Sequence, residues 1–260
     1  EILRERMNSK KGSVVTEDKT IGGDITIIHE DEAVLALNKP SGLVVNRSKT
    51  AKDKTLQDYL DEYLNLEQPE EGIQGSWQEL SPEEIFLRRS GMAHRLDKGT
   101  SGILLVAKTA EALKTLMKQF KDREIQKEYS ALVHGRLKDP KIEIDAPIGR
   151  NPRNRLKKAV VREGKPAKTL IEMVNFKEKY SIVKAKPKTG RTHQIRVHLA
   201  ALNHPVVGDH LYAPKGTRKE DREKFGRLML HAGEIEFIHP LSSKKVTLSA
   251  DIPLEFTKYY

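Results

Sequence analysis

The stretch that decides the fold is His94-Arg95-Leu96-Asp97-Lys98-Gly99-Thr100-Ser101-Gly102, followed directly by Ile103-Leu104-Leu105-Val106-Ala107. The first part is a turn rich in Gly, Ser and Thr, and the second is a short apolar run typical of a buried strand. Asp97 is therefore expected at the mouth of a rigid strand, with Arg95 and Lys98 close by to keep its carboxylate ionised. Such a carboxylate can act as nucleophile or general base, although an Asp in a turn is also a common turn-former or helix cap.

Composition narrows the class of protein. The 260 residues contain 47 Lys and Arg against 37 Asp and Glu, a net charge of +10 with neutral His, which favours a polyanionic partner over a merely basic soluble protein. The absence of Cys excludes thiolate nucleophiles, Cys-ligated zinc and disulfides, and it fits a reducing compartment. No apolar run is long enough to span a bilayer and no apolar signal core is present, so no membrane partner is expected.

The first part of the chain reads as a polar tail followed by short elements. Residues 1–24 are interpreted as an N-terminal tail or the remnant of an upstream module. Apolar β-rich runs at 25–28 and 34–37 predict two strands, and the breaker cluster 38–42 (Asn-Lys-Pro-Ser-Gly) is interpreted as a structural turn. Apolar residues at helical spacing behind a Thr N-cap predict a helix over 55–64.

Residues of about 65–90 form an acidic segment with scattered Gly and Pro. Because carboxylates repel phosphates, this segment is interpreted as a surface insertion that faces away from any nucleic acid. Beyond the strand after Asp97, apolar spacing over 113–120 predicts a core helix, and 127–133 predicts a strand that ends at Gly135. Residues 192–202 predict another helix, and 228–238 further strand. No linker divides residues 25–260.

The most basic part of the chain is the segment 150–168, where eight cations accompany one acid, Glu163. Its Pro, Asn and Gly residues argue against a regular helix, so a hairpin or mobile loop that grips phosphates is predicted. The alternative is a solvated charged loop. The cations are Arg150, Arg153, Arg155, Lys157, Lys158, Arg162, Lys165 and Lys168.

Four separated strings resemble, in order, the RluA-type pseudouridine synthases, which isomerise uridine to pseudouridine in ribosomal or transfer RNA. They are Asn38–Gly42, His94–Gly102, Lys127-Glu128-Tyr129 and Gly190–Leu199 (Gly-Arg-Thr-His-Gln-Ile-Arg-Val-His-Leu). The final strand region, Leu228–Ala232 with His239-Pro240, is similar as well, so the resemblance extends over about 25–255. It implies an α+β fold with a mixed, largely antiparallel central sheet, flanking helices and a central active-site cleft, in one catalytic domain over 25–260.

The resemblance also implies roles for individual residues. Asp97 is the essential aspartate, Tyr129 stacks on the target base, and Arg196 pairs with Asp97, with Arg191 as the competing cation. These side chains should converge within a few ångströms, with Arg95 and the basic segment lining the cleft mouth. The candidate RNA- or base-binding residues are Arg95, His94, Arg191, Leu230, Arg150, Arg153, Arg155, Lys157 and Lys158. Of these, Arg95 would fill the gap left by a flipped nucleotide, and Leu230 would pack against the base.

The chemistry of the isomerisation needs no redox step and no external group, so no cofactor is expected. His193 and His198 are five residues apart without a completing Glu or Cys, so no metal site is expected either. We expect a monomeric RNA pseudouridine synthase acting on ribosomal RNA, or on transfer RNA, in the bacterial cytoplasm or in an organelle with its own ribosomes. A non-catalytic RNA-binding protein that kept the fold is the alternative. A hydrolase is a further rival, but retaining glycosidases need two carboxylates and these strings offer one.

Overall fold

The protein is described by a computed structural model over residues 19–48, 52–68 and 76–260. Its main sheet has nine strands in the order β1-β2-β3-β10-β4-β9-β8-β5, with β11 paired to β10, and β6 and β7 form a separate hairpin. The strands are β1 (Thr26–Glu30), β2 (Val34–Lys39), β3 (Ser101–Ala107), β4 (Gln126–His134), β5 (Lys141–Asp145), β6 (Ile148–Asn151), β7 (Asn154–Val160), β8 (Lys168–Lys177), β9 (Tyr180–Pro187), β10 (Leu230–Ile238) and β11 (Lys245–Ser249). The helices are α2 (Leu56–Tyr63), α3 (Pro82–Arg89), α4 (Ala110–Asp122), α5 (Gln194–Ala201), α6 (Arg218–Phe225) and α7 (Leu254–Thr257).

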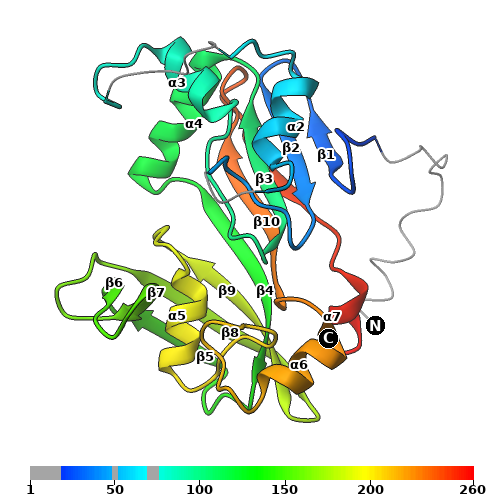
Figure 1. Ribbon diagram of the computed structural model, residues 1–260, viewed down its shortest axis with the longest axis vertical. Helices are drawn as coiled ribbons and strands as arrows, with labels where there is room; N and C mark the ends of the chain where they lie inside the picture. The colour runs from blue at the N-terminus through cyan, green and yellow to red at the C-terminus, as the bar shows by residue number, and fades with distance from the viewer. Residues whose placement is uncertain (1–18, 49–51, 69–75) are drawn as a thin grey trace.

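The sheet confirms the predicted α+β class, because every pairing is antiparallel except the short parallel contact between β3 and β10. One half of the sheet, β1, β2, β3 and β10, carries α2, α3 and α4, and the other half, β4, β9, β8 and β5, carries α5 and α6 (Figure 1). The long strand β4 pairs with β10 on one side and β9 on the other, so it joins the two halves. None of the helices in the described ranges is both long and apolar enough to cross a bilayer.

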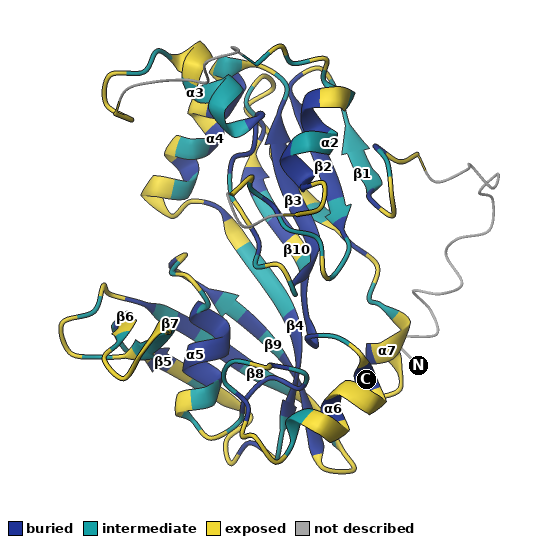
Figure 2. Cartoon of the chain, in the orientation of Figure 1, coloured by how far each residue is buried: buried dark blue, intermediate teal, exposed yellow. Residues whose placement is uncertain are grey.

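The strand after Asp97 is buried on both faces, which explains why its sequence is continuously apolar. Leu104 and Val106 of β3 pack with Leu56 and Leu60 of α2, whereas the alternate residues of β3 pack with α4. Figure 2 shows β2 and β3 as almost wholly buried. Such two-sided burial makes this strand a rigid support for the loop that precedes it.

The parallel contact between β3 and β10 requires glycine at position 102. Gly102 has a φ of 106°, and a Cβ there would lie 2.2 Å from the carbonyl oxygen of Ala232 in β10. Any other residue would force the two strands apart, because both its backbone conformation and its side chain conflict with the pairing. Gly102, the last residue of the string His94–Gly102, is therefore required for the packing of β3 against β10.

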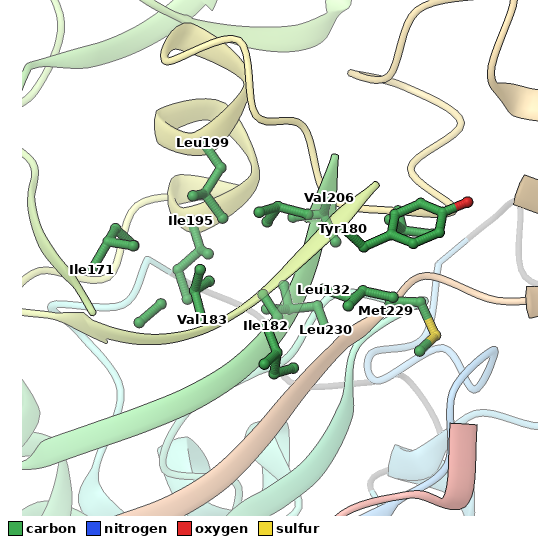
Figure 3. Packing of buried hydrophobic residues seen from close by; sticks show 14 of the residues in the cluster. Leu132, Ile171, Tyr180, Ile182, Val183, Ile195, Leu199, Val206, Met229 and Leu230 are labelled. Atoms are coloured by element: carbon green, nitrogen blue, oxygen red, sulfur yellow. The ribbon is translucent and has the colours of Figure 1, made fainter. Parts of the chain in front are cut away.

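Helix α5 lies on the other half of the sheet. Its apolar side chains Ile195 and Leu199 point toward the strands, where they meet Val183 of β9 and Ile171 of β8 (Figure 3). Gln194 fixes the start of the helix, since its amide donates to the carbonyl of Lys168 at 2.9 Å and its oxygen accepts from the Arg191 amide at 3.0 Å. These contacts fix the position of α5 on the sheet, and with it the position of the side chains that flank Ile195 and Leu199.

Helix ends follow the sequence signals closely. Thr55 caps α2 in a reciprocal capping box with Asp58, as the spacing predicts. Past α5, Asn203 adopts the left-handed conformation with a φ of 62°.

The acidic segment of about 65–90 is not simply a surface insertion, because it contains α3. Ser81 and Glu84 form a capping box, Pro82 occupies the first turn, and Ile85 and Phe86 pack on the core beneath α4. The sequence Ser81-Pro-Glu-Glu84 contains the signal for the start of this helix, within a segment whose net charge is acidic. Residues 69–75 of this segment lie outside the described residues.

The proposed N-terminal tail also ends earlier than predicted. Residues 1–18 lie outside the described part of the chain, but residues 19–24 pack against β1. The amide of Ile27 donates to the carbonyl of Lys19 at 2.8 Å, and Ile21 is buried in the core beside α2. Residues 19–24 thus belong with the folded unit and not with a tail.

Candidate active site

The loop that carries Asp97 is clamped from behind by the Asn38–Gly42 turn. Lys39, which is fully buried, donates from its ammonium group to the carbonyls of Pro40, Leu43 and Lys98 at 2.7, 3.0 and 3.2 Å. The Gly42 amide donates to the same Lys98 carbonyl at 2.8 Å. The three carbonyls match the three donors of an ammonium group, although burial, with Arg227 nearby, lowers the pKa of Lys39 to about 7. The turn interpreted as structural therefore determines where Asp97 is held.

The carboxylate of Asp97 accepts a hydrogen bond from Arg196 Nη1 at 3.0 Å. Arg196 projects from α5 and is 4% exposed, whereas the side chain of Asp97 is 23% exposed and opens to the cleft. Of the two cations proposed for this role, Arg196 makes the contact; Arg191 donates instead to the Pro166 carbonyl at 3.0 Å. Asp97 is thus charge-compensated on one side and accessible on the other.

A second carboxylate, Asp209, holds Arg196 from behind. Arg196 donates to Asp209 through Nε at 2.7 Å and Nη2 at 2.9 Å, and Asp209 is 1% exposed. The amides of Leu211 and Tyr212 donate to Asp209 at 2.9 and 3.1 Å. This bidentate pair fixes the plane of the guanidinium group, so that Nη1 is aimed at Asp97.

Burial and hydrogen bonding have opposite effects on the pKa values of Arg196 and Asp209. Burial would raise the pKa of Asp209, but the hydrogen bonds from Arg196 and from the two amides outweigh it and hold that pKa below its usual value. Burial would likewise lower the pKa of Arg196, but Asp209 and Asp97 raise it. Both groups are therefore ionised at neutral pH, and Arg196 provides a fixed positive charge beside Asp97.

His193 is a further neighbour of Asp97, with Nε2 at 3.9 Å from the carboxylate. The Tyr212 hydroxyl accepts from the Lys158 amide at 2.9 Å and is 2.7 Å from His193 Nδ1. The hydroxyl can donate to Nδ1 or accept from it, so Tyr212 links His193 to the backbone of Lys158 in either tautomer of the imidazole. Burial lowers the pKa of His193 despite the opposing effect of Asp97, which favours the neutral imidazole.

Asp97 opens into a cavity of about 560 Å³ that also contains Tyr129 of β4 and Leu230 of β10. Burial, and then the charge of Asp97, raises the pKa of the Tyr129 hydroxyl, so the phenol stays protonated. The lining also includes Arg95, His94 and Arg191. The cavity thus brings a carboxylate, an aromatic ring and an aliphatic side chain to one space.

His94, Arg95 and Lys98, the other candidate residues of the string His94–Gly102, have different environments. His94 accepts from the Leu105 amide at 2.9 Å and packs on Phe120, and burial lowers its pKa to about 3, so it is a neutral anchor to β3. Arg95 is exposed at the cavity. Arg95 and Lys98 form no ion pair with Asp97 in the described part of the chain; the cation that contacts its carboxylate is Arg196, at 3.0 Å.

The basic segment forms the hairpin β6–β7, as predicted, with Arg150 opposite Lys158. Arg150, Arg153 and Arg155 are exposed, and Lys157 and Lys158 are half-buried. None of these five cations lines the cavity at Asp97, so the hairpin does not form the cavity mouth as expected. It is connected to the site instead through the Lys158 amide and Tyr212.

Sequence reasoning missed three residues of this site: Asp209, Tyr212 and the functional placement of Lys39. Asp209 follows Gly208, whose φ of 77° and close approach to the Arg227 carbonyl mark a required turn. That Gly-Asp turn was a visible signal, but nothing in it indicates a partner thirteen residues back on a helix. Among residues 19–48, 52–68 and 76–260, no group of three or more His, Cys, Asp or Glu side chains is arranged to hold a metal ion.

Comparisons with known proteins are consistent among themselves. The family model described as RNA pseudouridylate synthase matches residues 33–201. The chain is 37% identical over 237 residues to "Ribosomal large subunit pseudouridine synthase D" of Xanthomonas campestris pv. campestris, covering 88% of this chain and 66% of that protein. It is 40% identical to the protein of the same name from Neisseria meningitidis serogroup A, covering 88% of this chain and 58% of the relative. The chain therefore spans less than two thirds of the length of either relative.

A solved structure gives the same result for the fold. "Human RNA Pseudouridylate Synthase Domain Containing 1" superposes with a TM-score of 0.68 at 28% sequence identity. The superposition covers 93% of this chain and 89% of the human chain. The arrangement of sheet and helices around the cavity is therefore shared with a solved protein.

Proposed function

Because the chain belongs to the RNA pseudouridylate synthase family, we propose that it isomerises uridine in RNA to pseudouridine, with Asp97 as the essential carboxylate. The observation that carries this proposal is the chain of contacts from Asp97 through Arg196 to Asp209, at the wall of a cavity that contains Tyr129. A protein that only binds RNA has no need for a carboxylate compensated by a buried arginine. The alternative of a non-catalytic RNA-binding protein is therefore disfavoured.

The reaction breaks the bond between ribose C1′ and uracil N1, turns the base, and forms a bond between C1′ and C5. C5 loses a proton and N1 gains one, so the product has the same atoms as the substrate. Asp97 acts as nucleophile or base, and Arg196 orients its carboxylate through the 3.0 Å hydrogen bond from Nη1. The target nucleotide must leave its stack to reach Asp97.

Within the cavity, the base is held by shape more than by charge. Tyr129 offers a ring face for stacking, and Leu230, which is 3% exposed, offers an aliphatic wall. Arg95, at the cavity rim, would occupy the space vacated by the flipped nucleotide. His94 and Arg191 line the same cavity, and the hairpin cations would bind neighbouring phosphates.

As substrate we propose ribosomal RNA, which is supported by the names of the bacterial relatives, with transfer RNA as the second candidate. We further propose that residues 25–260 act as one catalytic unit, extended by the packed residues 19–24, and that this unit is monomeric. The site of action would be where ribosomal RNA is made, the bacterial cytoplasm or an organelle with its own ribosomes.

The proposal is tested by incubating the protein with ribosomal RNA from cells that lack it and mapping pseudouridine at nucleotide resolution. New pseudouridine at a defined position is the expected result. Bound but unchanged RNA would support the non-catalytic alternative, and release of uracil or strand cleavage would support a hydrolase. Repeating the assay with transfer RNA separates the two substrate classes, and sedimentation of the active species tests the monomer.

A further inference from the structure

A second cavity of about 900 Å³ meets the first at Asp97. The two share a boundary formed by Arg95, Asp97, Thr192, His193 and Arg196. The second cavity extends away from Tyr129, toward the Asn38–Gly42 turn, the Gly-Asp turn at 208–211 and α6. A ligand that reaches Asp97 is therefore in contact with two different spaces.

The linings of the two cavities differ in chemistry. The first contains Phe120, Tyr129, Ile195 and Leu230. The second contains no Phe, Tyr or Trp among its lining residues. It combines cationic side chains and glycines, namely Lys98, Arg218, Arg222, Arg227, Gly42, Gly99, Gly208 and Gly226. Glu255 is the one acid in this lining apart from Asp97.

Two of these cations are held in place by the protein. Arg227 donates to the hydroxyl of Ser101 and to the carbonyl of Leu228, and Arg218 donates to the carbonyl of Ala213 at 2.9 Å. Both groups keep further N–H donors for a ligand, since a guanidinium has five. Arg222 lies one turn further along α6 and is exposed. The cavity therefore presents a pre-ordered set of donors and not only flexible surface charge.

The glycines make room beside these cations. A Cβ at Gly42 or at Gly226 would meet no heavy atom within 4 Å, so both positions border open space. Gly226 ends α6 next to Arg227, and the Gly42 amide bonds to the carbonyl of Lys98. Cations next to backbone without side chains allow close approach of a sugar–phosphate chain and provide no readout of base identity.

We propose that this second cavity binds the phosphates of the RNA strand that adjoins the flipped uridine, while the uracil ring occupies the first cavity. This inference rests on the proposed function, because it takes the first cavity as the uridine site. It divides the cleft at Asp97 into a base side and a backbone side. Arg222, Arg218, Arg227 and Lys98 are the residues assigned to the backbone side.

The test is the salt dependence of affinity for a fluorescein-labelled oligouridylate. Arg222→Gln removes one exposed cation from the cavity, and Lys219→Gln removes one from the same helix outside the cavity lining, as the matched control. Arg222→Gln should weaken binding several-fold at low salt and reduce the slope of log affinity against log salt by about 0.7, the value for one phosphate contact in a single strand. Lys219→Gln should leave the slope unchanged.

A double variant, Lys98→Gln with Arg222→Gln, sharpens the test, since its slope should fall by about twice as much. Equal slopes for Arg222→Gln, Lys219→Gln and the parent would overturn the inference. Thermal unfolding of each variant reports separately on folding. Binding slopes need no turnover, so a parent protein that forms no pseudouridine would defeat the proposed function by a different measurement.

Discussion

The active site and the hairpin β6–β7 both use arginine, in opposite ways. Arg196 is buried and bonded to two carboxylates, Asp97 and Asp209. The hairpin arginines are exposed, and none of the hairpin's five cations forms an ion pair within the described residues. A buried cation that is bonded to two carboxylates orients a reactive group, whereas exposed unpaired cations attract phosphates from a distance.

The two regions are nevertheless connected by a single hydroxyl. Tyr212 accepts from the amide of Lys158 in the hairpin and lies 2.7 Å from Nδ1 of His193, beside Asp97. A change in the hairpin backbone can therefore reach the site through this hydroxyl. Substitutions in the active site and in the hairpin should therefore have different effects on the catalytic rate, the free energy of unfolding and the affinity for RNA.

The largest effect should come from Asp97→Asn. Loss of the nucleophile or base should reduce isomerisation by about 10⁴-fold or more. RNA affinity should stay within a few fold, because phosphates provide most of it. Single-turnover assays and a binding titration on the same RNA measure both quantities. Activity close to that of the parent would contradict the role of Asp97 as nucleophile or base.

Asp209→Asn should affect stability as well as rate. It leaves the Arg196 charge buried with only Asp97 as partner, and breaking one side of a buried pair costs about 3–5 kcal/mol. Urea unfolding measures this loss, with Asp139→Asn in an exposed loop as the control, expected within about 0.5 kcal/mol. Equal stability of the two variants would show that Asp209 is not needed to hold Arg196.

Mild acid should destabilise the core beside the active site. His231 is fully buried, with Nδ1 2.9 Å from the Ser101 hydroxyl, and burial lowers its pKa to about 4. The native state keeps His231 neutral while the unfolded chain takes up a proton below about pH 6.5. Stability should therefore fall by about 3 kcal/mol as the pH drops from about 6.5 through 4.

The check is urea unfolding across this pH range for the parent and for His231→Gln. The variant should lose less stability on acidification, because the contribution of His231 is removed. It should still lose some, because the pKa of His94 is also lowered. An identical pH slope for both proteins would contradict the prediction. The hairpin has only Arg and Lys as cations, so its charge should not change over this range.

Neutralising the hairpin should change affinity and not chemistry. Arg153→Gln, Arg155→Gln and Lys157→Gln together should weaken RNA binding by about one to two orders of magnitude and flatten its salt dependence. A triple Lys→Gln variant at exposed positions 114, 138 and 244 removes the same charge elsewhere and serves as the control. The rate at saturating RNA should be unchanged, and a fall in that rate alone would show that the hairpin acts on the chemistry.

The smallest effect should come from Tyr212→Phe, which removes the hydroxyl that joins the two regions. One hydrogen bond is worth about 1 kcal/mol, so a loss of up to about tenfold in the single-turnover rate is expected. The pH profile of that rate should also shift, because His193, 3.9 Å from Asp97, loses its 2.7 Å contact with the Tyr212 hydroxyl. Tyr63→Phe, which loses a 2.9 Å bond to Glu30 elsewhere, is the control and should change neither quantity.

Local signals in the sequence were enough for much of the fold. The apolar run after Asp97 predicted β3, Thr55 and Asp58 predicted the start of α2, and Asn203 predicted the end of α5. Each depends on contacts within a few residues, which the sequence displays directly. Helix α3 was not predicted, because the acidic composition of its segment indicated a surface insertion more strongly than the capping signal at Ser81 indicated a helix.

The choice between Arg191 and Arg196 could not be made from spacing, since both lie near the start of one helix. The long-range pairs were equally hidden: Lys39 with the Lys98 carbonyl, and Asp209 with Arg196. Local patterns in the sequence specify most of the helices and strands, the basic charge and the strings around Asp97 that resemble the family. The tertiary structure alone decided which charges meet, because burying an ion is favourable only where distant segments bring its partner to hydrogen-bond distance.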